Sequence, residues 1–198
     1  MQLTKRIAIC FCLVLLGVLV ARADDWDKKT IFTFNAPAEI PGEALTPDTY
    51  VFKVFDSTMD RYIGRIWNKD ETELVATLLA IPDNRLTPSD KPIITSTERA
   101  KNAPLAIRAW FYPGDDYGFA FVYPKSKATE LAAANHQSVP SMSNSMTSQM
   151  ASSTNSKTSP GFQALEHTHV TAITPDKKEV EVGHAIQTKP SSSSNQPQ

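Results

Sequence analysis

The sequence predicts a mainly β fold: a single antiparallel β-sandwich, or an open barrel, with a short helix near residue 130 and a polar, disordered C-terminal tail that carries a small hairpin. Three observations predict it. β-Branched and aromatic residues recur with a period of two, Pro, Gly, Asp and Asn separate the runs, and all three Trp and all five Tyr lie between Trp26 and Tyr123. Roughly 100 residues are enough for one hydrophobic core.

The first 23 residues have the pattern of a cleavable signal peptide. Lys5 and Arg6 precede an apolar run of 14 residues, Ile7 to Val20, and Ala21-Arg22-Ala23 is a small-x-small cleavage motif. Because a membrane-spanning helix needs roughly 20 apolar residues, we expect cleavage after Ala23. The sequence therefore predicts a secreted or periplasmic protein that does not span a membrane after cleavage.

Cleavage changes the chemistry that the chain can perform. Both cysteines, Cys10 and Cys12, leave with the signal, which excludes disulfides and thiol chemistry from the mature protein. Three of the 20 basic residues leave as well, so 17 basic residues remain against 21 acidic ones. Without a basic cluster we expect no nucleic-acid partner. An exported chain without disulfides favours a bacterial source.

The predicted β-sandwich domain covers residues 24–134. Its seven short runs are residues 30–34, 50–55, 61–67, 74–81, 93–97, 106–111 and 119–123. The fourth run could also form a helix, but Val75, Thr77 and the following Pro82 favour a strand. Pro113-Gly114 predicts a hairpin turn, while Pro41-Gly42 is interpreted as a break in the chain.

The remaining chain is predicted to be less ordered. Residues 125–135 favour a short helix with Ser126 as a candidate N-cap. Residues 135–165 are interpreted as a flexible linker, because residues 138–161 hold nine Ser, three Thr and one charged residue. Residues 166–184 predict a small hairpin, which must dock on the main domain or on a partner because an isolated hairpin is marginal in water. Residues 185–198 are expected to be disordered.

Residues that could carry catalysis or bind metal are few. All four His lie outside the predicted core and no Gly-x-Ser-x-Gly motif exists, which argues against a serine hydrolase. The spacing of His167 and His169 is typical of metal ligands, yet two His in a polar segment are usually solvated. Asp115 and Asp116 could hold calcium or act on a glycosidic bond, although Asp in such sequence commonly stabilises the turn. We therefore expect no metal and no cofactor.

Aromatic residues gather around the turn at Pro113-Gly114. If alternate side chains point outward, they form a platform for a carbohydrate or another protein chain. The alternative is that one face forms the core and the other covers a sheet edge. The candidate binding residues are Trp110, Tyr112, Tyr117, Asp115 and Asp116.

Several motifs resemble a family of small exported bacterial proteins of unknown function. They are Trp26 to Thr30, Ile40-Pro41-Gly42, Leu45 to Lys53, Ala109 to Asp115 and Phe121 to Lys125, within residues 24–134, with a weaker likeness at residues 170–175. The family implies no activity, cofactor or catalytic residue. Leu45 to Tyr50 is also similar to a turn of prealbumin-like and carboxypeptidase-regulatory β-sandwich modules, with Thr46 in place of Pro and Asp48 in place of Gly. That similarity implies a sandwich and a non-catalytic role.

Together these observations favour an exported, non-enzymatic β-sandwich module that binds a protein or a glycan of the cell envelope. Two alternatives remain open. One is a carboxylate-dependent hydrolase that acts on an envelope polymer, and the other is a self-associating extracellular structural component.

Overall fold

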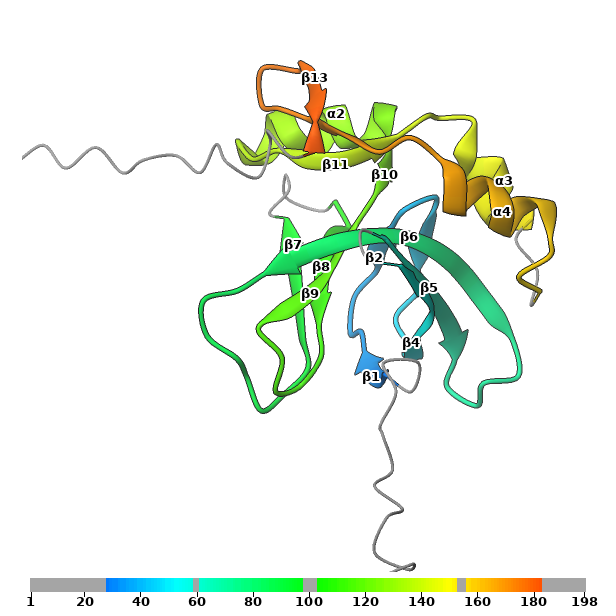
Figure 1. The fold of residues 1–198 in the computed structure, drawn as a ribbon. Helices are drawn as coiled ribbons and strands as arrows, with labels where there is room; N and C mark the ends of the chain where they lie inside the picture. Colours follow the sequence, from blue (N-terminus) through cyan, green and yellow to red (C-terminus); the bar gives the residue numbers. More distant parts are fainter. Residues whose placement is uncertain (1–27, 59–60, 98–102, 153–155, 183–198) are drawn as a thin grey trace, which may run out of the picture.

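The computed structural model describes residues 28–58, 61–97, 103–152 and 156–182. The predicted signal peptide and the predicted tail at residues 185–198 lie outside these residues. The described chain is mainly β, as predicted, and consists of a nine-stranded sheet, a four-stranded sheet and three helices (Figure 1). The sheets are not closed into a barrel. Within the described residues no helix is long and apolar enough to cross a membrane.

The larger sheet contains all seven runs predicted as strands and two short strands that were not predicted. Its members are β1 (Lys29–Thr33), β2 (Ala38–Ile40), β3 (Glu43–Leu45), β4 (Thr49–Thr58), β5 (Arg61–Asn68), β6 (Leu74–Asn84), β7 (Ile93–Thr97), β8 (Leu105–Phe111) and β9 (Tyr117–Phe121). Their order is β1-β4-β5-β6-β9-β8-β2-β3, with β7 also paired to β8. Among the described strands of this sheet, only β2 and β8 pair in parallel.

The turn at Pro41-Gly42 joins β2 to β3 rather than simply breaking the chain. Ile40 pairs with Glu43 across it, and Gly42 has φ +85°. A positive φ at the third residue is the requirement of a type II turn, and proline is common at the position before it. Each strand has three residues, which is too short for the alternation of apolar residues to be recognised.

The core lies where the larger sheet folds back on itself and brings β1 and β4 against β8. The indole Nε1 of Trp110 donates a hydrogen bond of 3.2 Å to the buried Thr30 hydroxyl. The rings of Phe52 and Trp110 pack edge to face at 6.0 Å. Aromatic residues of strands distant in sequence therefore form one interior, with the edge-to-face geometry that aromatic pairs prefer.

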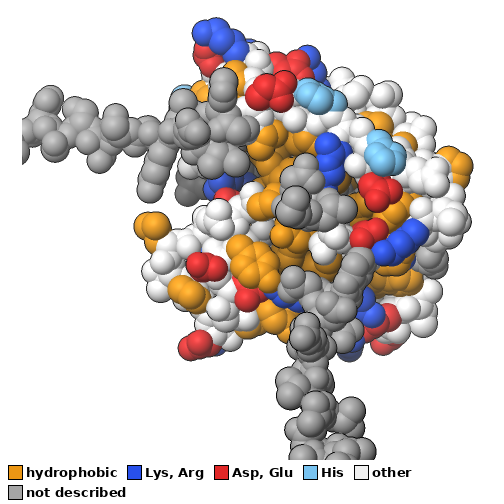
Figure 2. All heavy atoms as spheres, viewed as in Figure 1, with side chains coloured by type: hydrophobic (Ala, Val, Ile, Leu, Met, Phe, Trp, Pro, Cys, Tyr) orange, Lys and Arg blue, Asp and Glu red, His pale blue; other side chains and the backbone are white. Residues whose placement is uncertain are grey.

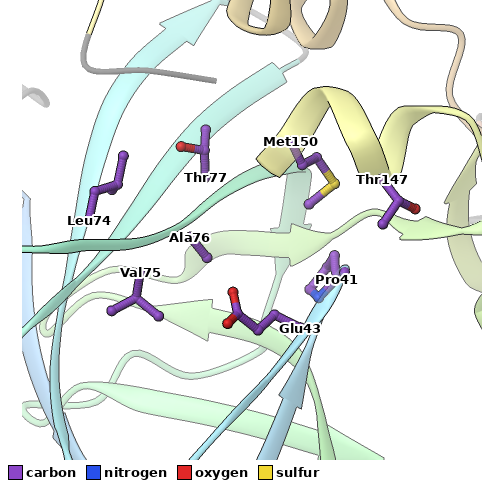
Figure 3. Close-up of a pocket in the computed structure, with 9 residues that line it drawn as sticks. Pro41, Glu43, Leu74, Val75, Ala76, Thr77, Thr147 and Met150 are labelled. Carbon is purple, nitrogen blue, oxygen red and sulfur yellow. The ribbon is translucent and has the colours of Figure 1, made fainter. Parts of the chain in front are cut away.

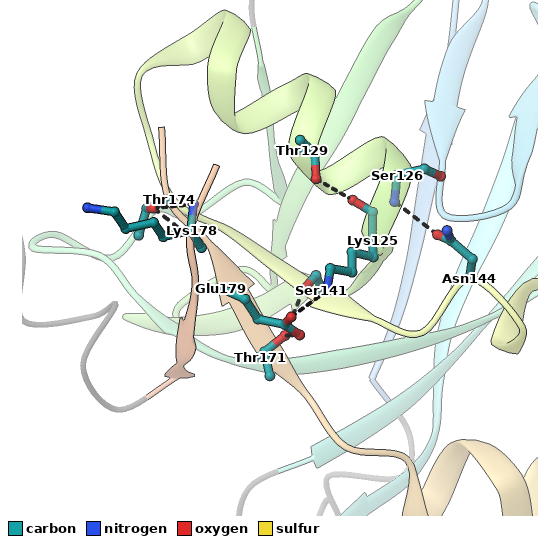
Figure 4. A network of polar contacts seen from close by, with 9 residues as sticks. All are labelled: Lys125, Ser126, Thr129, Ser141, Asn144, Thr171, Thr174, Lys178 and Glu179. Atoms are coloured by element: carbon teal, nitrogen blue, oxygen red, sulfur yellow. Dashed lines mark hydrogen bonds and ion pairs between the residues drawn. The ribbon is translucent and has the colours of Figure 1, made fainter. Parts of the chain in front are cut away.

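The smaller sheet begins where β9 ends. It contains β10 (Tyr123–Pro124), β11 (Val139–Met142), β12 (Thr171–Ile173) and β13 (Glu179–Glu181). The predicted C-terminal hairpin is the β12–β13 pair, and it docks on β11 of the same chain. A buried hydrogen bond of 2.8 Å between the hydroxyls of Ser141 and Thr171 joins the hairpin to β11. Glu179 accepts from Thr171 and Lys125, and the Lys125 contact is the main cause of its lowered pKa (Figure 4).

Helix α2 (Lys125–Asn135) connects β10 to the parallel strand β11 and has the predicted boundaries. The predicted N-cap was wrong. Pro124 occupies the N-cap position without a side-chain hydrogen bond, and the backbone N–H of Ser126 donates instead to Oδ1 of Asn144 at 2.9 Å (Figure 4). A side chain 18 positions later therefore satisfies one of the free N–H groups at the start of the helix.

The segment interpreted as a flexible linker, residues 135–165, is folded over most of its length. It contains β11, α3 (Met146–Ser152) and α4 (Pro160–His167). Its few large apolar side chains are buried, namely Met142, Met146, Met150, Phe162 and Leu165. The Ser and Thr residues act as caps and local hydrogen-bond partners. Ser159 is one example, because its hydroxyl accepts from the N–H of Phe162 at the start of α4.

Helices α3 and α4 cover the outer face of β5 and β6. A β-bulge between Val54 and Asp56 leaves Phe55 without a paired residue on β5, and its ring packs edge to face on Phe162 at 5.5 Å. The guanidinium of buried Arg65 lies over the ring of Phe55, with its Cζ 3.2 Å from the ring centre. Burial lowers the pKa of this guanidinium. The bulge thus directs one aromatic ring into the contact between sheet and helices.

Candidate functional site

The structure does not support the aromatic platform predicted around residues 110–117. Trp110 is 2% exposed and belongs to the core. Tyr112 and Tyr117 are half-buried, and the Nζ of Lys28 lies 4.0 Å from the ring centre of Tyr117 and 5.6 Å from that of Tyr112. Lys28 also forms an ion pair of 2.5 Å with Asp115 and a hydrogen bond with the Tyr117 hydroxyl. These rings therefore face the core or Lys28 rather than forming an open stacking surface, and a binding role for them stays a prediction.

The other candidates lie apart from one another. Asp116 is exposed, and its backbone oxygen accepts from the N–H of Arg85 at 2.7 Å. His167 ends α4, while His169 is exposed beside β12 with its Nε2 3.7 Å from Oε1 of Glu181. In the described part of the chain, no three residues among His, Cys, Asp and Glu come together as metal ligands would.

A different candidate site is the gap between the edges of strands β3 and β6. Strand β6 pairs with β5 from Leu74 to Ala80, but with β9 only from Ala80 onward. The oxygen of Leu79 accepts from the N–H of Val122 at 3.0 Å, so the backbone groups of Leu79 point to the β9 side. Because alternate residues of a strand share this direction, the backbone groups of Thr77 point the same way. Among the described residues no strand lies beside Thr77 on that side.

Strand β3 ends the sheet and faces this part of β6 across a pocket of about 120 Å³. The pocket walls come from three elements (Figure 3). They are Pro41, Gly42 and Glu43 of the β2–β3 hairpin, residues 74–77 of β6, and Thr147 and Met150 of α3. Pockets for small molecules and cofactors usually enclose about 300–1,000 Å³. This pocket is therefore of the size that accommodates a single side chain.

Two polar groups of the pocket have no protein partner within the described chain. Thr77 is 3% exposed, and its Oγ1 has no hydrogen-bond partner there. Leaving a buried hydroxyl without a partner costs about 1–3 kcal/mol. Glu43 is exposed and forms no ion pair with a described residue, and Figure 3 shows its carboxylate directed toward β6 beside Ala76. The pocket thus has an anion at its rim, while the hydroxyl oxygen of Thr77 is buried within the wall.

The surrounding surface carries charges of both signs. Figure 2 shows hydrophobic side chains gathered in the middle of the face seen in Figure 1, with Lys, Arg, Asp and Glu around them. The large apolar side chains that are strongly exposed, Ile31, Leu86 and Leu105, lie on separate segments. On this face, charges of the two signs therefore lie interspersed around the apolar side chains.

Sequence reasoning missed this site because no motif marks Glu43 or Thr77. One signal was present in the strand lengths. β6 has 11 residues and its neighbour β9 has five, so part of β6 must lack a partner on that side. The unequal lengths of the predicted runs 74–81 and 119–123 become a signal only once the two strands are known to pair.

Comparison with protein-family models, with curated proteins and with solved structures finds no match for this chain. The resemblance to small exported proteins of unknown function therefore stays a prediction.

Proposed function

We propose that this protein is an exported, non-enzymatic binding module that takes up an extended segment of another polypeptide between β3 and β6. The observation that carries the proposal is the edge of β6 at Thr77, which has no neighbouring strand in the described chain. A strand edge without a neighbouring strand can pair with an added strand through backbone hydrogen bonds. Export rests on the signal-peptide pattern of residues 1–23.

The geometry favours a polypeptide over a glycan. Carbohydrate recognition by stacking needs exposed aromatic faces, but Trp110 is buried and Lys28 lies over the ring of Tyr117. A strand edge instead offers repeated backbone donors and acceptors, which only another backbone matches in spacing. The size of the adjoining pocket, about 120 Å³, also suits one side chain of such a segment.

The arrangement of carboxylates favours binding over hydrolysis. Asp115 pairs with Lys28, Glu39 with Lys127, and Glu71 with both Lys29 and Lys53. These carboxylates therefore form contacts between segments of the fold. Hydrolysis of a glycosidic bond instead requires two carboxyl groups that face each other across a substrate.

The test uses the mature chain, residues 24–198, and an array of seven-residue peptides that alternate Thr and Val around a varied central residue. We expect some members to bind and to slow hydrogen exchange at the amide of Thr77, because that amide would donate to the peptide. N-methylation of alternate peptide amides should abolish binding, since it removes the backbone donors. The proposal fails if no peptide binds, or if binding protects other amides and tolerates N-methylation.

A further inference from the structure

We infer that the open edge of β1 binds β1 of a second copy of this chain, so that two larger sheets join across a two-fold axis at Ile31. Strand β1 stands at one end of the strand order and, among the described strands, pairs only with β4. This edge is separate from the edge of β6 at Thr77, so the inference does not depend on the proposed function.

The backbone of β1 offers alternate residues to an added strand. The oxygen of Lys28 accepts from the N–H of Val54 in β4 at 3.2 Å, so the backbone of Lys28 faces β4. Because this direction alternates along an antiparallel strand, the even-numbered residues of β1 bond to β4. The N–H and C=O groups of Lys29, Ile31 and Thr33 therefore face the open side, where no described strand lies beside them.

One two-fold register uses the whole strand. In antiparallel pairing, residues whose backbone groups face each other exchange two hydrogen bonds. An axis at Ile31 places this residue opposite itself and places Lys29 opposite Thr33 of the second copy, so all of β1 is paired. Moving the axis to Thr30 or Phe32 would leave one of these hydrogen-bonded pairs outside the strand.

The apolar side chains fit this register. Ile31 is 58% exposed, and it lies opposite Val51, which in turn lies opposite Trp67. Side chains directly opposite each other on paired strands share one face of the sheet, so these three residues form an apolar row that ends at the open edge. The two-fold axis joins this row to its copy through a contact between the two Ile31 side chains, which removes apolar surface from water.

The charges permit self-pairing at β1 and oppose it at the edge of the smaller sheet. Like charges directly opposite each other on paired strands are destabilising. Lys29 meets the uncharged Thr33 of the second copy, and its ammonium group forms an ion pair with Glu71. On β13, a two-fold pairing of the strand would place Glu179 opposite Glu181. Of these two edges, β1 is therefore the one that suits a second copy.

Sedimentation velocity of the mature chain, residues 24–198, tests the dimer. A single strand pair is a small contact, so we expect a weak dimer. A monomer–dimer equilibrium should become visible as the protein concentration is raised to about 1 mM. A chain that stays monomeric throughout this range would overturn the inference.

A substitution at the axis tests the assigned edge. Ile31→Lys should raise the dissociation constant about tenfold or more, because it removes the apolar contact and sets two like charges opposite each other. Leu86→Lys is the matched control, because Leu86 is 94% exposed in the connection between β6 and β7, and it should leave the dissociation constant unchanged. Unfolding curves confirm that each variant folds. A dimer that is as strong in Ile31→Lys as in the wild type refutes pairing through β1.

Cysteine substitution tests the position of the axis. The mature chain has no cysteine, since Cys10 and Cys12 precede it. Ile31→Cys should form a disulfide-linked dimer under mild oxidation, because hydrogen-bonded antiparallel pairs have Cα atoms about 5.5 Å apart, within the range of disulfides. Leu86→Cys, which replaces a more exposed residue, should form several times less of such a dimer. Equal yields for the two variants would show that residue 31 does not meet its copy.

Discussion

Replacing Gly118 by alanine should destabilise the protein strongly, because the ring of Phe111 occupies the space beside this glycine. The two residues are paired across β8 and β9. A Cβ at position 118 would lie 2.5 Å from Cδ1 of Phe111 and 2.7 Å from the backbone oxygen of Trp110. The ring could rotate away, but the oxygen belongs to the hairpin backbone, so the strands themselves must shift.

The expected cost follows from this geometry. Overpacking of a well-packed interior costs about 1–3 kcal/mol, and the neighbouring Trp110 and Phe119 are both buried. We expect the upper half of that range for Gly118→Ala. For a chain of this size, each kcal/mol lowers Tm by about 2–4 °C, so the midpoint should fall by roughly 4–12 °C. Urea unfolding followed by tryptophan fluorescence, together with calorimetry, measures both quantities.

Gly64 provides the matched control in another strand of the same sheet. A Cβ there meets only the backbone oxygen of Lys53, at 3.7 Å, which is ordinary contact. A small apolar cavity adjoins Gly64 between Leu78 and Trp110. Gly64→Ala should therefore be neutral or stabilise by up to about 1 kcal/mol, because alanine restricts the unfolded chain. Equal unfolding midpoints for Gly118→Ala and the wild type would refute the description of the Phe111 contact.

Two further predictions concern polar contacts. Thr171→Val should lower the free energy of unfolding by about 1–3 kcal/mol, because it leaves the buried Ser141 hydroxyl without its partner. In a double-mutant cycle, adding Ser141→Ala should recover most of that loss. Additive losses for the two substitutions would contradict this prediction. The pKa of Glu71 is lowered by its hydrogen bonds from Lys29 and Lys53, so folding favours the ionised form. Its stabilisation is present above the pKa of an unfolded glutamate, about pH 4, and is lost as the pH falls through the lowered value. Acid unfolding of Glu71→Gln should thus be less steep than that of the wild type, and identical acid profiles would show that these contacts contribute nothing.

The strands of the larger sheet were predictable because their signals are local. Alternating apolar residues and turn residues marked β4 to β9 within a few positions at each end. Strands β2 and β3 were missed because three residues show no periodicity. The hairpin is held in the sheet by the pairing of β2 with β8, more than 60 positions later in the chain.

The folded segment between α2 and β12 was missed because its composition concealed its pattern. Serine and threonine dominate it, yet Met142, Met146 and Met150 recur every four residues and are all buried. Met142 ends β11, and Met146 and Met150 lie one helical turn apart on α3, so a few buried side chains are enough to hold this segment on the sheet. The candidate site could not be predicted from the sequence for a related reason. It depends on which edge of β6 lacks a neighbouring strand, and the pairing of strands is decided by the whole chain.

The helices over β5 and β6 have a consequence for how the protein reaches its final form. Arg61 donates to the backbone oxygens of Glu166 and Thr168, across 105 and 107 positions of sequence. Synthesis delivers the N-terminal strands first, and the outer face of β5 and β6 stays uncovered until the helices are made. Contacts this distant in sequence also slow folding. A chain that acquires its covering last therefore keeps one face of its larger sheet open to water, or to another molecule, for longer during synthesis.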